Sequence, residues 1–247
     1  MTELILSDVT RMGMGLCVIG LERTEGGYRS VRPGPTRGHA WPSQFPYHRG
    51  DRLQMELLPA VGEIPPHLED HRSNGLMKKL GAHDEAELLA CLRQAEMARS
   101  LKELFGCPVQ VQRRGGFIWP TRARRSICGV ENPRLRLKME GREIRAMVGF
   151  PSGETAELKV VDRSWEAFVA AALAEMQGLG RLDRLHRFFD GVLARAGEAG
   201  RFVRIGVTRP SPRRCWLMAD SVFPMPRHSW LEELLEENSI EGRDDVR

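Results

Sequence analysis

The chain has 247 residues, of which 41% are hydrophobic and 28% charged, with a formal net charge of +4. This length fits one large domain or two small ones, and the composition excludes a disordered chain. Because no apolar stretch approaches the roughly 20 residues that span a bilayer, and the first residues lack a signal-peptide pattern, we expect a cytoplasmic protein with no membrane partner.

Residues 1–72 are predicted to form a first β unit. Short apolar segments between turn-forming residues indicate strands at 4–6, 15–21, 28–31 and 53–57. A long loop rich in proline, glycine and aromatic residues covers 33–50, and we expect Pro59 and the Pro65-Pro66 pair to end the unit. Several short strands with turn-rich links are typical of a small barrel or sandwich.

Residues 73–106 are predicted to be a helical connector. Asp84 is placed to cap a helix, and Glu87 follows three residues later, as in a capping box. An apolar stripe continues to Phe105, and Gly106 is a C-terminal stop signal.

Residues 107–228 are predicted to form a second β unit with a helical insert at 164–197, and an acidic tail follows at 229–247. From Trp165 to Met176 the apolar residues recur at the spacing of one helix face. The order of strands, helix and two further strands suits an OB-type barrel. The predicted fold class is therefore α+β, with two small β-barrel (OB-like) units and helical insertions.

The net charge of +4 hides an uneven distribution along the chain. Seven acids and two arginines lie between Glu232 and Arg247, so the remainder has 35 basic and 26 acidic residues, a charge of +9. Only five of the basic residues are lysines. A GC-rich genome would favour arginine codons, whereas a phosphate-binding surface would use the guanidinium fork. Composition leaves both explanations open.

Three clusters of arginine contain aromatic residues. Two of them, over 113–125 and 201–216, contain no acid, and the third, over 29–52, contains only Asp51. Cations that follow phosphates and rings that stack on bases suit single-stranded nucleic acid. Alternatively, Trp119 and Trp216 are core residues and the arginines form a solvated face. The candidate phosphate contacts are Arg32, Arg37, Arg124, Arg125, Arg209, Arg213 and Arg214, and the candidate stacking platforms are Trp41, Tyr47 and Trp119.

Other chemistry has weak support. The odd number of cysteines without close pairs argues against disulfide frameworks and zinc sites. His67 and His71 have the spacing of two metal ligands on a helix, but no third ligand is near, so we expect neither a metal nor a cofactor. No catalytic residues are assigned. A hidden active site would best fit the 33–50 loop, which holds His39 and His48 beside Asp51.

Several segments resemble the dual OB-containing domain proteins of prokaryotes. These are Glu3–Thr10 with Gly15–Gly20, and Ile205–Pro210 followed by Cys215–Met218. The resemblance covers most of the chain in order. It implies two OB-like barrels and a nucleic-acid-binding role, in a family associated with antiviral or mobile-element conflict systems. It supplies no catalytic residues.

The expected function is binding of single-stranded DNA or RNA, as an accessory subunit of a prokaryotic antiviral or mobile-element conflict system. Two alternatives remain open. The chain is a protein–protein adaptor that holds a nuclease or an ATPase through helices at 85–105 and 164–197, or it is an enzyme whose site lies in the 33–50 loop.

Overall fold

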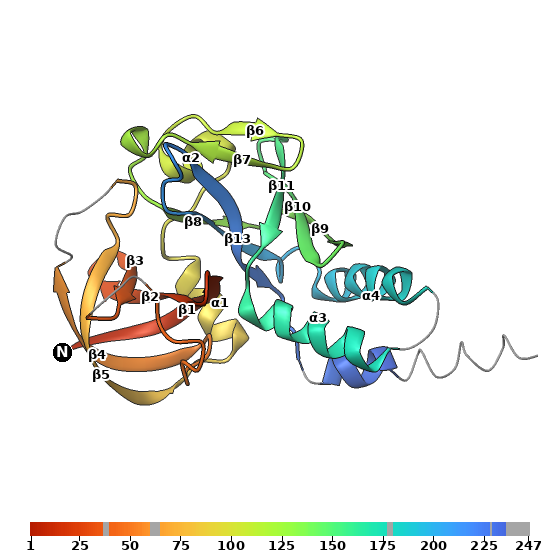
Figure 1. The fold of residues 1–247 in the computed structure, drawn as a ribbon, viewed down its shortest axis with the longest axis horizontal. Coiled ribbons are helices and arrows are strands. Elements are labelled where there is room, and N and C mark those ends of the chain that lie inside the picture. The colour runs from red at the N-terminus through yellow and green to blue at the C-terminus, as the bar shows by residue number, and fades with distance from the viewer. Residues whose placement is uncertain (37–39, 60–64, 177–179, 228, 236–247) are drawn as a thin grey trace, which may run out of the picture.

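The computed structural model describes residues 1–36, 40–59, 65–176, 180–227 and 229–235. The fold is α+β, with a β-barrel on one side and a curled sheet with its helices on the other (Figure 1). Within these ranges no helix is both long and apolar enough to cross a membrane.

The first unit is a closed barrel with the strand order β1-β2-β3-β5-β4. The start of β1 pairs with β4, and the rest of β1 pairs with β2. Strands β3 and β5 are parallel. The interior is filled by alternating apolar residues such as Leu4, Leu6 and Leu53, all fully buried. The strands are β1 (Thr2–Met12), β2 (Gly15–Thr24), β3 (Gly27–Gly34), β4 (Asp51–Pro59) and β5 (Asp70–Ala82).

The predicted helical connector is wrong for residues 73–82, and the barrel does not end at residue 72. These residues belong to β5, which pairs with β4 along its length and with β3 at its start. The hydrogen-bonding edges of β3 and β4 need this strand, so tertiary pairing decides its conformation over local preference. Helix begins only with α1 (Glu85–Leu92), followed by α2 (Leu101–Phe105).

The capping box at the start of α1 is confirmed. Asp84 accepts a hydrogen bond from the Glu87 backbone N–H at 2.9 Å, and the Glu87 carboxylate accepts one from the Asp84 N–H at 2.9 Å. Gly106 ends α2 with a φ of 68°, a backbone conformation that favours glycine.

The second unit is an eight-stranded curled sheet rather than a second closed barrel. Asn132-Pro133 splits its leading strand into β8 and β9, since Asn132 has a φ of 49° and proline offers no N–H. The strands are β6 (Gln110–Gln112), β7 (Gly115–Ile118), β8 (Ile127–Glu131), β9 (Arg134–Glu140), β10 (Glu143–Gly149), β11 (Thr155–Val160), β12 (Phe202–Val207) and β13 (Cys215–Phe223).

The strand pairings of this sheet repeat those of the barrel. The segment β8–β9 pairs with β12 through its first part and with β10 through its second, as β1 pairs with β4 and β2. The parallel pair β11–β13 corresponds to β3–β5, and the antiparallel pair β12–β13 to β4–β5. The two units therefore share one connectivity, although in the second the circuit of pairings runs through the interrupted strand β8–β9.

The predicted helical insert is confirmed as two helices, α3 (Arg163–Glu175) and α4 (Arg181–Ala196). The apolar face of α3, including Trp165 and Phe168, packs in the core of the second unit, and so does Phe189 of α4. In Figure 1 both helices lie beside the second sheet, on the side of the molecule away from β4 and β5.

The two units meet along β1 and β13. Arg204 and Asp8 are both fully buried, and Arg204 Nε lies 3.3 Å from Asp8 Oδ2. The Ser221 hydroxyl donates to the Ser7 carbonyl at 3.1 Å. A separate apolar cluster that includes Ile5 and Phe202 packs around α1 at this seam. Buried ion pairs and apolar contacts thus fix one unit against the other.

Candidate functional site

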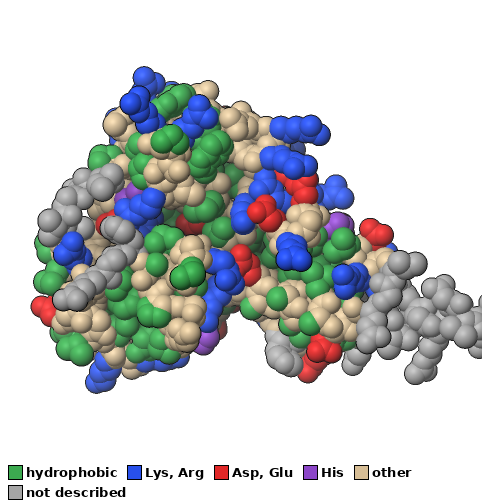
Figure 2. Space-filling model, viewed as in Figure 1, with side chains coloured by type: hydrophobic (Ala, Val, Ile, Leu, Met, Phe, Trp, Pro, Cys, Tyr) green, Lys and Arg blue, Asp and Glu red, His purple; other side chains and the backbone are tan. Residues whose placement is uncertain are grey.

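Two of the three arginine clusters are brought together by strand pairing. Ile118 of β7 pairs with Cys215 of β13, and Phe117 pairs with Trp216. Trp119 comes directly after β7 and is 38% exposed. We define the basic–aromatic patch as Trp119, Arg122, Arg213 and Arg214. Figure 2 shows Lys and Arg side chains interspersed with hydrophobic ones at the end of the molecule where Figure 1 places α2 and β7.

The aromatic rings of this region form a connected base. The Phe117 ring lies 5.2 Å from Trp119 and 5.4 Å from Trp216, with both pairs edge to face. The Arg214 guanidinium stands 4.5 Å from the centre of the Phe117 ring, and that of Arg122 stands 5.9 Å from Trp119. Phe117 is buried, so Trp119 is the ring that offers a face to a ligand.

The patch arginines have no carboxylate partner in the described parts of the chain. Arg122, Arg213 and Arg214 are exposed and form no ion pair there. Arg113 is likewise exposed and unpaired at the other end of β7, whereas its neighbour Arg114 pairs with Glu140. The guanidinium groups of the patch are therefore available to phosphate oxygens.

In the described part of the third arginine cluster, the arginines pair with carboxylates. Arg29 pairs with Glu22, Arg32 with Asp70, Arg49 with Asp162 and Arg52 with Glu3. Arg32 is also buried, and it donates to the Ser126 hydroxyl at 2.8 Å. A phosphate would have to displace a carboxylate from the buried arginines Arg32 and Arg49, whereas the exposed pairs of Arg29 and Arg52 are weaker.

The predicted stacking rings of the 33–50 loop point inward. Trp41 is 7% exposed, and its indole N–H donates to the Pro33 carbonyl at 2.6 Å. Tyr47 is half-buried, with its ring centre 5.4 Å from that of Phe45. Arg37 and His39 lie outside the described residues.

The remaining predicted arginines lie apart from the patch. Arg124 and Arg125 line a groove with Arg29 and His71, and Arg125 donates to the Glu103 carbonyl at 3.0 Å. Arg209 pairs with Asp70. The structure thus places the segment of Arg213 and Arg214 next to Trp119, but these three arginines contact other groups.

The 33–50 loop does not assemble the expected enzyme site in its described part. His48 is exposed, and its backbone N–H, not its imidazole, donates to Asp51 at 2.9 Å. Asp51 also pairs with Lys79 at 2.5 Å. The carboxylate is therefore used to hold the loop and to neutralise a lysine.

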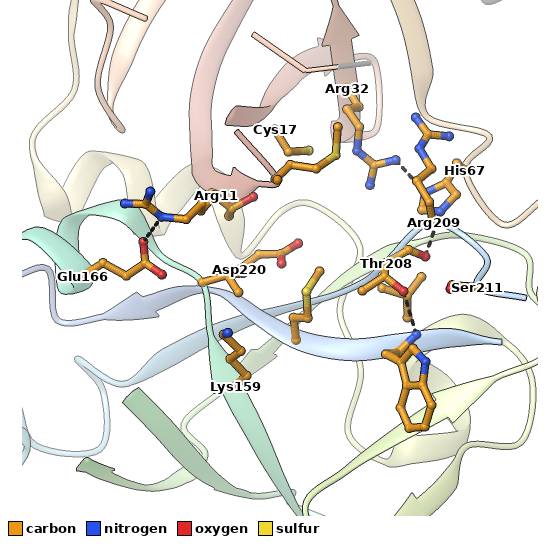
Figure 3. A pocket seen from close by; sticks show the side chains of 17 residues that line it. Arg11, Cys17, Arg32, His67, Lys159, Glu166, Thr208, Arg209, Ser211 and Asp220 are labelled. Carbon is orange, nitrogen blue, oxygen red and sulfur yellow. Dashed lines mark hydrogen bonds and ion pairs between the residues drawn. The ribbon is translucent and has the colours of Figure 1, made fainter. Parts of the chain in front are cut away.

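A cavity of about 520 Å³ lies between the two units (Figure 3). It was not expected from the sequence, because its walls come from segments far apart in the chain. The available signal was Asp220-Ser221, two polar residues within the otherwise apolar β13. The walls include Cys17 of β2, Arg32 of β3, His67, Lys159 of β11, Thr208 and Asp220.

His67 has a structural role in this wall. Its Nδ1 accepts a hydrogen bond from Arg32 Nη1 at 2.7 Å, so its Nε2 carries the proton and donates to the Thr208 carbonyl at 3.2 Å. Burial, reinforced by Arg32 and Arg209, lowers the pKa of His67 to about 3. The imidazole is neutral with both nitrogens occupied, so it links the two units and does not act as a base.

Asp220 is the distinctive group of the cavity. Burial, reinforced by the nearby Asp8 carboxylate, raises the pKa of Asp220 to about 8. Its Oδ1 atom is buried and has no hydrogen-bond partner among the described residues. Burial also raises the pKa of the Cys17 thiol. The wall therefore presents a protonated carboxyl, a neutral imidazole and a protonated thiol, which together do not form a nucleophile with its base.

The helices predicted to dock a partner bury their apolar faces in the protein itself. Leu88 and Leu92 of α1, and Val192 of α4, are core residues. Among the residues that the structure describes, no group of three or more His, Cys, Asp or Glu side chains could hold a metal ion. No known protein family, no curated protein and no solved structure matches this chain.

Proposed function

We propose that this protein binds single-stranded nucleic acid through the basic–aromatic patch. The supporting observation is that the pairing of β7 with β13 brings Trp119 and Arg122 next to the segment that carries Arg213 and Arg214. The Arg122 guanidinium lies over the exposed Trp119 ring and that of Arg214 over Phe117, and none of the three arginines has an ion pair among the described residues. Arginines that follow the phosphates and a ring that stacks on a base are the two elements of sequence-tolerant binding to single strands. Separately, an accessory role in a prokaryotic antiviral or mobile-element conflict system rests on the sequence resemblance alone.

We further propose that both units are OB-type barrels. Their shared connectivity, with a five-strand order and a parallel third and fifth strand, supports this assignment. OB barrels bind oligonucleotides through the loops between strands 1 and 2 and between strands 4 and 5. In the second unit the loop from β12 to β13 corresponds to the latter, and it carries Arg213 and Arg214.

The test is fluorescence anisotropy with a labelled single-stranded oligonucleotide of DNA or RNA. If about four phosphates are neutralised, the affinity falls roughly 50-fold between 50 and 200 mM salt, because log K follows log salt with a slope of about −0.7 per phosphate. Trp119→Ala should weaken binding about 5- to 150-fold, the effect of one lost stacking contact.

The matched pair of variants is Arg213→Glu and Arg23→Glu. Both reverse one exposed arginine, but Arg23 lies on β2 of the barrel, outside the patch. Arg213→Glu should weaken binding and flatten the salt dependence, whereas Arg23→Glu should change neither. Absence of binding at low salt, or equal losses in both variants, would reject the proposal.

A further inference from the structure

We propose that the cavity between the two units binds one nucleotide, with the Asp220 carboxyl contacting the base edge and Arg11 and Lys159 holding the phosphate. The nucleotide is either free or part of a bound single strand. For the strand as its source, the inference rests on the proposed function.

The size and lining of the cavity suit this ligand. Its volume of about 520 Å³ lies within the usual range for small-molecule sites, about 300–1,000 Å³. Val161, Val207 and Met218 supply apolar wall, with Trp216 beside them. Such a site typically combines an apolar wall for a flat ring with a few polar groups that fix its orientation.

Two local features place the Asp220 carboxyl. In the pairing of β12 with β13, Arg204 stands opposite Ser221 and Ile205 opposite Ala219, so Asp220 is the extra residue of a bulge. Bulges re-aim a side chain and often occur beside functional sites. Gly206, which pairs with Met218, leaves room for the carboxyl, since a Cβ there would lie 2.0 Å from Asp220 Oδ2. Figure 3 shows Asp220 directed toward the space between Arg11, Cys17 and Arg32.

The carboxyl is buried without the partners that such a group normally has. Asp220 is 4% exposed, and its Oδ1 makes no hydrogen bond with any residue that the structure describes. Buried polar atoms are nearly always paired, so an unpaired one in a cavity wall points to a ligand or bound water as the partner. The charged and titratable groups that face it are Asp8, Arg32, Asp162, Arg204 and Cys17.

The protonation state of Asp220 decides which base edge it fits. A protonated carboxyl offers one donor beside one acceptor, which matches the amino group and ring nitrogen of adenine or cytosine. An ionised carboxylate only accepts, which matches the adjacent N–H groups of guanine. Since burial keeps the proton on Asp220 at neutral pH, adenine or cytosine should be preferred.

The phosphate site lies at one side of the cavity. Arg11 pairs there with Glu166 at 3.0 Å, and Lys159 pairs with Glu143 at 2.7 Å. The Arg11 side chain is 67% exposed and that of Lys159 is 43% exposed. Exposed ion pairs of this kind are weak, so both cations can exchange a carboxylate for a phosphate.

The experiment is calorimetric titration of the full chain with AMP, CMP and GMP at pH 6.5 and pH 9, at low salt. At pH 6.5 we expect AMP or CMP to bind about tenfold more tightly than GMP, the discrimination of one two-hydrogen-bond contact. At pH 9 this preference should disappear or reverse.

Two variants tie the preference to the carboxyl. Asp220→Asn retains one donor and one acceptor without a charge, so its preference should be the same at both pH values. Asp220→Leu, which offers neither, should show no preference. If the leucine variant does not fold, the asparagine variant alone decides, because an unchanged pH dependence in it overturns the inference. Absence of saturable nucleotide binding, together with base-independent oligonucleotide binding, also overturns it.

Oligonucleotides of defined base composition separate the two sources and the two proposals. If Asp220→Asn removes the pH dependence of the base preference in strand binding, the strand supplies the nucleotide. If it does so only for mononucleotides, the free nucleotide is the ligand. Binding of strands that depends on Arg213 but on no base would leave the proposed function standing and reject this inference. Binding of mononucleotides without any strand binding would reject the proposed function and leave the cavity as a site for a free nucleotide.

Discussion

Replacing Arg49 with alanine is expected to destabilise the protein by about 3–5 kcal/mol, the usual cost of leaving one buried charge unpaired. Arg49 Nη1 lies 2.6 Å from Asp162 Oδ2, and both side chains are only 3% exposed. Asp162 also accepts the backbone N–H groups of Ser164 and Val222. Without Arg49, this carboxylate remains buried at the seam between the two units.

The loss should appear in urea denaturation and as a fall in Tm of about 6–20 °C, since 1 kcal/mol corresponds to roughly 2–4 °C in a chain of this size. Asp162→Asn in the Arg49→Ala background should recover part of the stability, because the asparagine carries no charge. The control is Arg52→Ala, whose partner Glu3 is 47% exposed, with an expected cost of at most about 1 kcal/mol. Equal effects of the two alanine variants would refute the reasoning.

Three further predictions concern the cavity wall. The pKa of Asp220 is 3.8 in the unfolded chain and about 8 in the folded protein, so its contribution to the free energy of unfolding falls as the pH rises from 3.8 to 8. Asp220→Asn should remove that fall, as measured by urea denaturation at pH 5, 7 and 9. Gly206→Ala places a methyl group against the Asp220 carboxyl and should cost about 1–3 kcal/mol in the same assay. His67→Ala leaves an Arg32 N–H and the Thr208 carbonyl without their partner, at about 1–3 kcal/mol. In the native chain His67 stays neutral, so its contribution should decline as the pH falls from 6.5 towards 3.

Local patterns in the sequence predicted the elements whose conformation is decided locally. The capping box of Asp84 and Glu87 starts α1, and the apolar face that begins at Trp165 belongs to α3. The prediction of helix was wrong for residues 73–82, because their strand exists only through pairing with β3 and β4. Proline at 65 and 66 suggested an end to the β unit, but the barrel needed a fifth strand after it.

The availability of each arginine could not be predicted from the sequence. Arg32 looks free within its cluster, yet its partner Asp70 lies 38 residues away, and the partner of Arg49 lies 113 residues away. A local window cannot reveal such pairs. The aromatic residues differ for the same reason, since Trp41 is enclosed by the barrel while Trp119 follows a strand at the surface.

The patch and the cavity share one structural element, the loop from β12 to β13. Thr208, Arg209 and Ser211 at its start line the cavity, and Arg213 and Arg214 at its end belong to the patch. Contacts across the seam hold this loop. His67 donates a hydrogen bond to the Thr208 carbonyl, and Arg209 forms an ion pair with Asp70. We propose that a nucleic-acid strand bound at the patch follows this loop to the cavity. Such preorganisation lowers the entropic cost of binding, so weakening the seam should reduce affinity even where no residue that contacts the strand is changed.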